Sequence, residues 1–135
     1  MQFTPKVMIV DDVQMIRRAL KISLLKAGVT GVTEAKNGAE AIELLKQEKF
    51  DLIICDWEMP NMSGLELLQK IRSDGRLKNI AFLMATAVTD TENVTKAIQA
   101  GVTDYVTKPF QPDILCKKLV TTYAKSRKQP NKSPT

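Results

Sequence analysis

Residues 50–58, FDLIICDWE, contain an apolar run of four side chains that ends directly on a carboxylate. A second such run, Val7–Val10, is followed at once by Asp11 and Asp12, and a third spans Ala81–Ala85. Short, nearly continuous apolar runs are typical of strands that are buried on both faces of a parallel sheet. These three segments therefore predict the central strands of one sheet.

Helical stretches separate the apolar runs. Apolar residues recur at helix spacing after the first run, at Ile16, Leu20 and Leu24, and similar spacing follows the other runs. Weaker strand-like runs at 32–35 and 105–106 complete five repeats of a strand followed by a helix. Strands that alternate with helices predict an α/β fold, a doubly wound five-stranded parallel sheet flanked by five helices.

Residues that favour helix starts and ends fall between these expected elements. They are the turn pair Asn37-Gly38, the capping boxes Ser63-Glu66 and Thr89-Glu92, Pro112 at a helix start, and Gly28 and Gly101 at helix ends. The final helix is expected to bury one apolar face, made of Leu115, Cys116, Leu119, Val120 and Tyr123. Residues 1–124 are expected to form one domain, and the basic residues 125–135 a disordered tail.

The composition narrows the class of protein before any motif is considered. The chain has 135 residues, a formal net charge of +5 and no histidine. The absence of histidine excludes histidine-ligated metal sites, and serine or cysteine nucleophiles activated by histidine, within this chain. The two cysteines, Cys55 and Cys116, form no CxxC motif and are expected to be free thiols in a reducing compartment. No apolar run is long enough for a membrane span, so a cytoplasmic protein without a membrane partner is expected.

The positive charge is concentrated at the C-terminal end. Residues 1–107 carry 13 Lys or Arg against 14 Asp or Glu, whereas residues 108–135 carry seven Lys or Arg and one acid, Asp113. The basic residues lack interleaved aromatic side chains and any recognisable motif, so no specific nucleic-acid partner is expected, only weak and nonspecific attachment. The same charge could instead steer an acidic protein partner.

Acidic and polar residues follow four of the predicted strands. Asp11 and Asp12 follow the first, Asp56 the third, Thr86 the fourth and Lys108 the fifth. Because the carboxyl ends of parallel strands meet at one edge of a sheet, these side chains are expected to converge if the four strands are neighbours. A structural alternative is that each aspartate only caps a helix N-terminus, which is favourable by about 0.3–1 kcal/mol. The coincidence of all these residues at strand ends favours a shared site.

The three carboxylates would repel one another without a counterion, so the cluster calls for a cation. Oxygen ligands select a hard ion, and Mg²⁺ that keeps several waters is the expected occupant. A carboxylate beside Mg²⁺ can also act as a nucleophile toward phosphorus and form an aspartyl phosphate. Thr86 and Lys108 would then contact the phosphoryl oxygens through a hydroxyl and an ammonium group.

The chain contains the motifs VDD at 10–12, DWEMPNMSG at 56–64, TA at 86–87 and YVTKPF at 105–110. Together these motifs resemble a response-regulator receiver domain, most closely the single-domain, CheY-like chemotaxis type. The resemblance covers about residues 5–124 and implies the flavodoxin-like form of the doubly wound fold. It implies that one aspartate, Asp56, accepts a phosphoryl group from a histidine kinase.

The resemblance also implies a set of metal ligands. Asp12 and Asp56 would bind Mg²⁺ through their carboxylates. Asp11 would act through a water molecule, and Glu58 would contribute its backbone carbonyl oxygen. The expected metal-binding residues are therefore Asp11, Asp12, Asp56 and Glu58.

A switch is implied by the same resemblance. Thr86 and Lys108 would hold the phosphoryl group bound to Asp56. Thr86 would move toward the phosphoryl oxygens, and Tyr105 would swing inward into the vacated space. The surface formed by the helix around 94–98, the strand that contains Tyr105 and the final helix would then change its affinity for a protein partner.

The resemblance implies a histidine kinase as phosphodonor and a downstream protein target, with the flagellar motor switch as a candidate. A phosphatase is a further candidate partner, and a monomer is expected. Two positions depart from the chemotaxis type. Glu58 stands where that type carries Asn, and Val88 stands where it carries Glu. Both flank the path of the attacking water, so the lifetime of the phosphorylated form stays open.

A stand-alone receiver, which acts as a phosphoacceptor switch rather than as a turnover enzyme, is the leading hypothesis. A receiver domain cut from a longer regulator is one alternative, since residues 131–135 could begin a linker. An aspartate-nucleophile phosphatase is another, because Asp56-x-Glu58 is similar to a paired nucleophile and general acid. Against the phosphatase, the acceptor follows the third predicted strand instead of the first.

Overall fold

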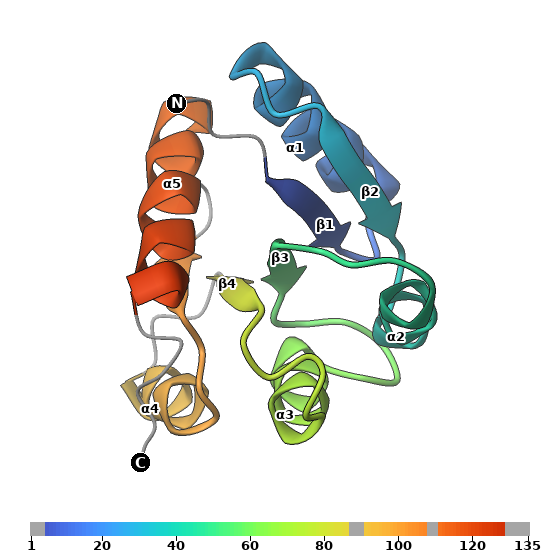
Figure 1. Ribbon diagram of the computed structural model, residues 1–135, viewed down its shortest axis with the longest axis vertical. Helices are drawn as coiled ribbons and strands as arrows, with labels where there is room; N and C mark the ends of the chain where they lie inside the picture. Colours follow the sequence, from blue (N-terminus) through green and yellow to red (C-terminus); the bar gives the residue numbers. More distant parts are fainter. Residues whose placement is uncertain (1–4, 87–90, 108–110, 129–135) are drawn as a thin grey trace.

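The computed structural model describes residues 5–86, 91–107 and 111–128. Within these ranges one sheet contains the strands β1 (Lys6–Val10), β2 (Gly31–Ala35), β3 (Leu52–Asp56), β4 (Ala81–Thr86) and β5 (Asp104–Thr107). The strands alternate with the helices α1 (Gln14–Lys26), α2 (Gly38–Gln47), α3 (Gly64–Ser73), α4 (Thr91–Gln99) and α5 (Pro112–Lys128). Every strand pair is parallel and the order is β2-β1-β3-β4-β5, which confirms the predicted doubly wound α/β fold (Figure 1).

The sheet is covered by helices on both faces (Figure 1). Alternate strand residues point to opposite sides. Val7 and Ile9 belong to a core that includes α1 and α5, whereas Met8 and Val10 belong to a core that includes α2 and α3. In β3 the segment Leu52–Cys55 is buried throughout, as its continuous apolar sequence predicts. Polar side chains can therefore gather at the strand ends rather than on the faces of the sheet.

Two predicted helix boundaries are confirmed by hydrogen bonds. The Asn37 side chain caps α2 by accepting a hydrogen bond from the N–H of Glu40 at 2.7 Å. The capping box before α3 is complete, since the Ser63 hydroxyl accepts from the Glu66 N–H and the Glu66 carboxylate accepts from the Ser63 N–H. Thr89, which begins the other predicted capping box, lies outside the described residues.

The final helix is longer than predicted. It begins at Pro112 as expected, but it continues to Lys128, so residues 125–128 are helical instead of part of a disordered tail. This end of the helix is held against the sheet by an ion pair, in which Lys125 Nζ lies 2.8 Å from Asp104 Oδ2 at the start of β5. Residues 129–135 of the predicted tail lie outside the described part of the chain.

The buried face of α5 also differs from the prediction at one position. Leu115 and Leu119 are buried as expected, but Val120 is 49% exposed and Thr122 is fully buried. Side chains three or four residues apart share a helix face. Thr122 follows Leu119 by three residues and therefore joins the buried face, from which Val120 points away. The side chain of Cys116 lies outside the described part of the structure.

Asp104 is a buried carboxylate between β5 and α5. It is 8% exposed, and two ammonium groups approach it, that of Lys125 at 2.8 Å and that of Lys118 at 3.3 Å. Burial raises the pKa of Asp104, but the Lys125 hydrogen bond, the Tyr105 N–H and the charge of Lys118 together lower it below its usual value. The carboxylate is therefore charged at neutral pH and ties α5 to β5.

Replacing Asp104 by Asn is expected to lower the free energy of unfolding by about 1–2 kcal/mol at pH 7, because two ammonium groups lose their shared carboxylate. The pKa of Asp104 is lower in the folded chain than in an unfolded one. Its stabilising contribution is therefore complete above the unfolded value and disappears as the pH falls through the folded value. Urea denaturation from pH 7 downward should show the gap between wild type and variant closing. A gap independent of pH would contradict the assignment.

Arg72 on α3 holds the segments that lead into the amino ends of β4 and β5. Its Nε donates to the Gly101 carbonyl at 2.8 Å, and its Nη1 donates to the carbonyls of Ile80 at 2.7 Å and Lys78 at 3.0 Å. Burial lowers the pKa of Arg72 to about 10, which leaves it charged at neutral pH. Gly101 has a φ of 93° and ends α4 as predicted. This network joins α3 to the turn after α4, far from the carboxyl ends of the strands.

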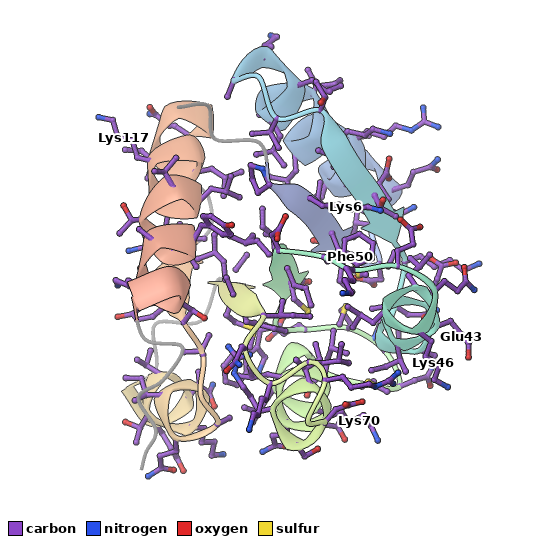
Figure 2. The ribbon with its side chains drawn as sticks, viewed as in Figure 1. Lys6, Glu43, Lys46, Phe50, Lys70 and Lys117 are labelled. Carbon is purple, nitrogen blue, oxygen red and sulfur yellow. The ribbon has the colours of Figure 1, made fainter. Side chains whose placement is uncertain are left out.

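Charged side chains lie on the outer surfaces of the helices (Figure 2). Lys70 on α3 and Lys117 on α5 point away from the sheet, whereas Lys6 lies over the Phe50 ring, 5.1 Å from its centroid. Among the described residues, no helix combines the length and the apolar character that crossing a membrane requires.

Candidate functional site

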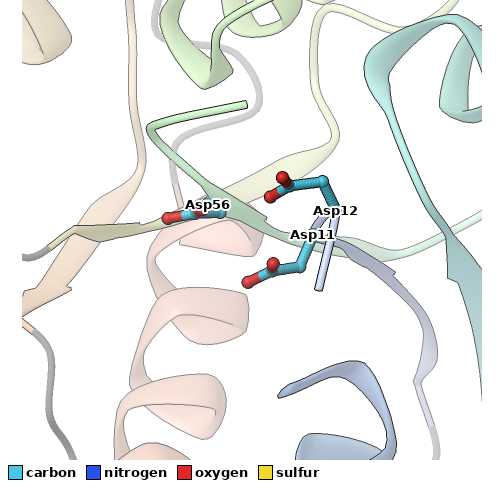
Figure 3. A group of neighbouring side chains, drawn as sticks. All are labelled: Asp11, Asp12 and Asp56. Atoms are coloured by element: carbon cyan, nitrogen blue, oxygen red, sulfur yellow. The ribbon is translucent and has the colours of Figure 1, made fainter. Parts of the chain in front are cut away.

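Strands β1 and β3 place three carboxylates together. The two strands are neighbours, with Val10 paired to Cys55, so Asp11 and Asp12 leave β1 beside Asp56 at the end of β3. One carboxylate oxygen from each aspartate lies within 4.8 Å of the others. Figure 3 shows the three carboxyl groups on the same side of the strand ends. The structure thus brings together the three acids that were expected to converge because the carboxyl ends of parallel strands meet at one edge of a sheet.

The three aspartates differ in their exposure to solvent. Asp11 is 2% exposed, Asp56 is half-buried and Asp12 is exposed. A site whose donor atoms are all oxygens fits a hard divalent ion such as Mg²⁺. The exposed side of this site leaves room for waters that the ion retains. Because clustered carboxylates repel one another, a cation would also relieve their repulsion. The chemistry of the donors therefore fits Mg²⁺.

Asp11 is fixed by hydrogen bonds at its N–H, its carboxylate and its carbonyl. Its N–H donates to the Ala35 carbonyl at 3.2 Å, and its Oδ1 accepts from the Val13 N–H at 2.9 Å. Its carbonyl accepts from Arg17 Nη1 at 2.8 Å. Arg17 was not among the predicted site residues, because its contact joins a strand end to a helix turn and matches no spacing rule for metal ligands.

The loop after Asp56 turns back against the strand ends. The Trp57 N–H donates to the Ala85 carbonyl at 3.0 Å, and the Gly64 N–H donates to the Trp57 carbonyl at 2.8 Å. Asn61, at the tip of this loop, has a φ of 71°, a left-handed conformation that asparagine tolerates. Both ends of the loop are therefore anchored beside the carboxylate of Asp56.

Gly64 packs directly against the backbone of Asp56. A Cβ at this position would clash with the Asp56 carbonyl oxygen and would lie 2.9 Å from Met84 Sδ. Only glycine permits so close an approach of α3 to the end of β3. This role was also missed, although Gly64 closes the motif at 56–64 and follows the predicted cap Ser63.

The other predicted site residues are only partly described. Thr86 ends β4 and is paired in register with Thr107, but its side chain lies outside the described part of the structure. Lys108 and Val88 both lie in undescribed segments of the chain. Tyr105 lies in β5, paired in register with Met84, and is 37% exposed.

Glu58 lies in the loop two residues after Asp56, and its side chain is exposed. Among the described acids, those that gather within 4.8 Å are the three aspartates, so the Glu58 carboxylate is not one of the group. This position lends no support to a general acid paired with Asp56. A metal-binding role for the Glu58 backbone carbonyl stays a prediction.

The sequence model of the response regulator receiver domain family matches residues 7–120. The chain is 41% identical to chemotaxis protein CheY of Pseudomonas aeruginosa over 114 residues, which are 84% of this chain and 92% of that protein. It is 42% identical to chemotaxis protein CheY-3 of Vibrio cholerae over 114 residues, which are 84% of this chain and 88% of that protein.

Solved structures agree with the sequence comparison. The structure of chemotaxis protein CheY4 of Vibrio cholerae superposes with a TM-score of 0.84 at 34% identity, covering 89% of this chain and 99% of that chain. A CheY-like receiver domain protein of Methanospirillum hungatei superposes with a TM-score of 0.85 at 28% identity, covering 94% of this chain and 99% of that chain. From the family match, the relatives and the fold, the chain belongs to the response regulator receiver domain family and is of the CheY type.

Proposed function

We propose that the chain is a phosphorylation-dependent switch of a two-component system, with Asp56 as the phosphoacceptor. The observation that carries the proposal is the convergence of Asp56 with Asp11 and Asp12 at the ends of neighbouring strands. Asp56 is half-buried, so a donor can reach its carboxylate while the backbone around it is held in place. Membership of the receiver family supports a histidine kinase as the donor.

In the proposed transfer, a carboxylate oxygen of Asp56 attacks phosphorus and an O–P bond forms. The P–N bond to the imidazole of the donor histidine breaks, and the nitrogen leaves with its electron pair. Thr86 and Lys108 are proposed to hold the phosphoryl oxygens by hydroxyl and ammonium donors. Thr86 ends β4, the neighbour of β3, and Lys108 directly follows β5, so the strand order supports both assignments.

The proposed Mg²⁺ ligands are the carboxylates of Asp12 and Asp56, with Asp11 acting through a water molecule. The backbone carbonyl of Glu58 is a further proposed ligand. When bound, the ion supplies positive charge beside the phosphoryl oxygens. Carboxylate oxygens of Asp11 and Asp12, which follow β1, lie within 4.8 Å of one from Asp56, which supports a shared metal site.

The output is proposed to be protein binding at the face formed by α4, β5 and α5. Exposed apolar side chains lie on each of these elements, namely Ile98 on α4, Tyr105 on β5, and Ile114 and Val120 on α5. Exposed apolar groups of this kind favour a protein partner. Movement of Thr86 toward the phosphoryl group, followed by Tyr105, would change this face and shift its affinity.

Chemotaxis is the proposed context, because the two curated relatives are named chemotaxis proteins. The downstream partner would then be the flagellar motor switch or another protein that binds the same face. A phosphatase is proposed as a further partner. Glu58 stands beside the acceptor in the loop, where its charge would influence the attack of water on the phosphorylated form.

Treatment with acetyl phosphate tests the proposal without the kinase. In the presence of Mg²⁺ we expect stoichiometric labelling, as the P–O bond of the donor breaks and acetate leaves. Chelation of the metal should reduce the labelling strongly, because the phosphoryl charge is then uncompensated. Intact-mass spectrometry measures both states. Absent or metal-independent labelling would contradict the proposal, and continuous phosphate release from phosphomonoesters would instead favour a phosphatase.

A further inference from the structure

We propose that Arg17 is a positioning residue of the acidic site and that it sets the affinity for the divalent ion. This inference rests on the proposed function, since it concerns the same site. Arg17 lies in the first turns of α1, and its guanidinium reaches the carbonyl of Asp11 from the side of β2. It touches neither Asp12 nor Asp56 through any hydrogen bond described in the structure, so it would act through Asp11 alone.

The guanidinium of Arg17 joins three elements. Nη1 donates to the Asp11 carbonyl at 2.8 Å, and Nε donates to Glu34 Oε1 at 3.1 Å. Asp11 follows β1, Glu34 lies in β2 and Arg17 lies in α1. The planar fork of arginine allows both bonds at once, with Nε directed to one strand and Nη1 to the next. The position of the Asp11 backbone is therefore tied to the position of α1.

The side chains of Arg17 and its partner Glu34 are largely shielded from water. The Arg17 side chain is 13% exposed and that of Glu34 is 25% exposed, so water competes little for either group. Lys21 also approaches Glu34, at 3.9 Å, but its side chain is 40% exposed. In a partly desolvated pair a charged hydrogen bond is stronger than on the open surface. Glu34 thereby fixes the guanidinium that in turn fixes Asp11.

The positioning role and a simple charge effect predict opposite outcomes. Arg17 is a cation near a cluster of carboxylates, so Coulomb repulsion alone predicts that its removal strengthens the binding of a divalent ion. Loss of positioning predicts weaker binding, because Asp11 would have to be ordered when the ion binds. The sign of the change in affinity therefore decides between the two.

The test is a titration of the full chain with Mg²⁺, followed by Trp57 fluorescence and by calorimetry. Arg17→Met is expected to raise the dissociation constant about tenfold, the scale seen when partners of metal ligands are removed. Lys21→Met is the matched control. It removes one positive charge from the same helix and the same glutamate, but it has no described contact with Asp11. The Lys21→Met variant should bind Mg²⁺ as tightly as wild type or more tightly.

Glu34→Gln provides a second variant in case Arg17→Met does not fold. It should weaken Mg²⁺ binding in the same direction, and the double variant should bind no more weakly than Arg17→Met alone, because Glu34 acts through Arg17. Arg17→Lys, which keeps one donor, should recover part of the loss. The free energy of unfolding of each variant, measured with the metal chelated, shows whether the variant changes stability as well as Mg²⁺ affinity.

The outcomes distinguish this inference from the proposed function. If wild type binds no divalent ion, the proposed function fails. If wild type binds Mg²⁺ while Arg17→Met binds it equally or more tightly, the positioning role is wrong and the proposed function stands. Additive effects of Arg17→Met and Glu34→Gln would likewise overturn the chain of contacts from Glu34 to Asp11.

Discussion

An Asp56→Asn variant is expected to take up no phosphoryl group from acetyl phosphate at any Mg²⁺ concentration. The amide of asparagine is a poor nucleophile, and none of the neighbouring groups occupies the same place at the end of β3. The fold should survive, because Asp56 is half-buried at the strand end and asparagine has nearly the same volume. Intact-mass spectrometry of the variant and of wild type, treated in parallel, measures the effect.

Asp12→Asn is the control for a loss that acts through the metal. Asp12 is exposed and belongs to the same acidic group. Its replacement should raise the Mg²⁺ concentration that half-maximal labelling requires, and excess Mg²⁺ should restore the labelling. Labelling of Asp56→Asn that reappears with excess Mg²⁺ would contradict the assignment of Asp56 as the acceptor.

A Gly64→Ala variant is expected to lose about 3 kcal/mol of unfolding free energy and to bind Mg²⁺ more weakly than wild type. The added methyl group would clash with the carbonyl oxygen of Asp56 and crowd Met84. Because the clash is with backbone, it cannot be relieved by a change of rotamer. The start of α3 or the end of β3 has to move, and that movement displaces the acceptor. Urea denaturation and Mg²⁺ titration measure the two effects.

Gly75→Ala is the matched control for Gly64→Ala. A Cβ at Gly75 would meet no atom within 4 Å, and the residue does not have a positive φ. Its stability should be unchanged or slightly higher, by roughly 0.5 kcal/mol, because alanine restricts the unfolded chain. If the two alanine variants had equal stability and equal Mg²⁺ affinity, close packing at Gly64 would not support the site.

The sheet and the three aspartates could be predicted because they follow from local patterns. Each central strand is a short continuous apolar run, and the carboxylates of Asp11, Asp12 and Asp56 come directly after such runs. Because the carboxyl ends of parallel strands meet at one edge of the sheet, residues that follow different strands are expected to lie close together in space. No contact between distant side chains had to be known in advance.

The parts that could not be predicted depend on contacts between distant side chains. Arg17 meets Glu34 only because β2 pairs with β1 and α1 packs beside both. The last turns of α5 are polar in sequence, yet they are helical, and Lys125 within them pairs with the buried carboxylate of Asp104. Amino-acid pattern alone treats such residues as solvated charges.

The most direct measurement is the location of the phosphoryl group in the wild-type chain. After treatment with acetyl phosphate and Mg²⁺, borohydride reduction converts an aspartyl phosphate into homoserine, which tandem mass spectrometry assigns to a sequence position. The proposed site predicts homoserine at position 56 and only with Mg²⁺ present. Homoserine at position 11 or 12 instead, or an unmodified chain, would contradict the account.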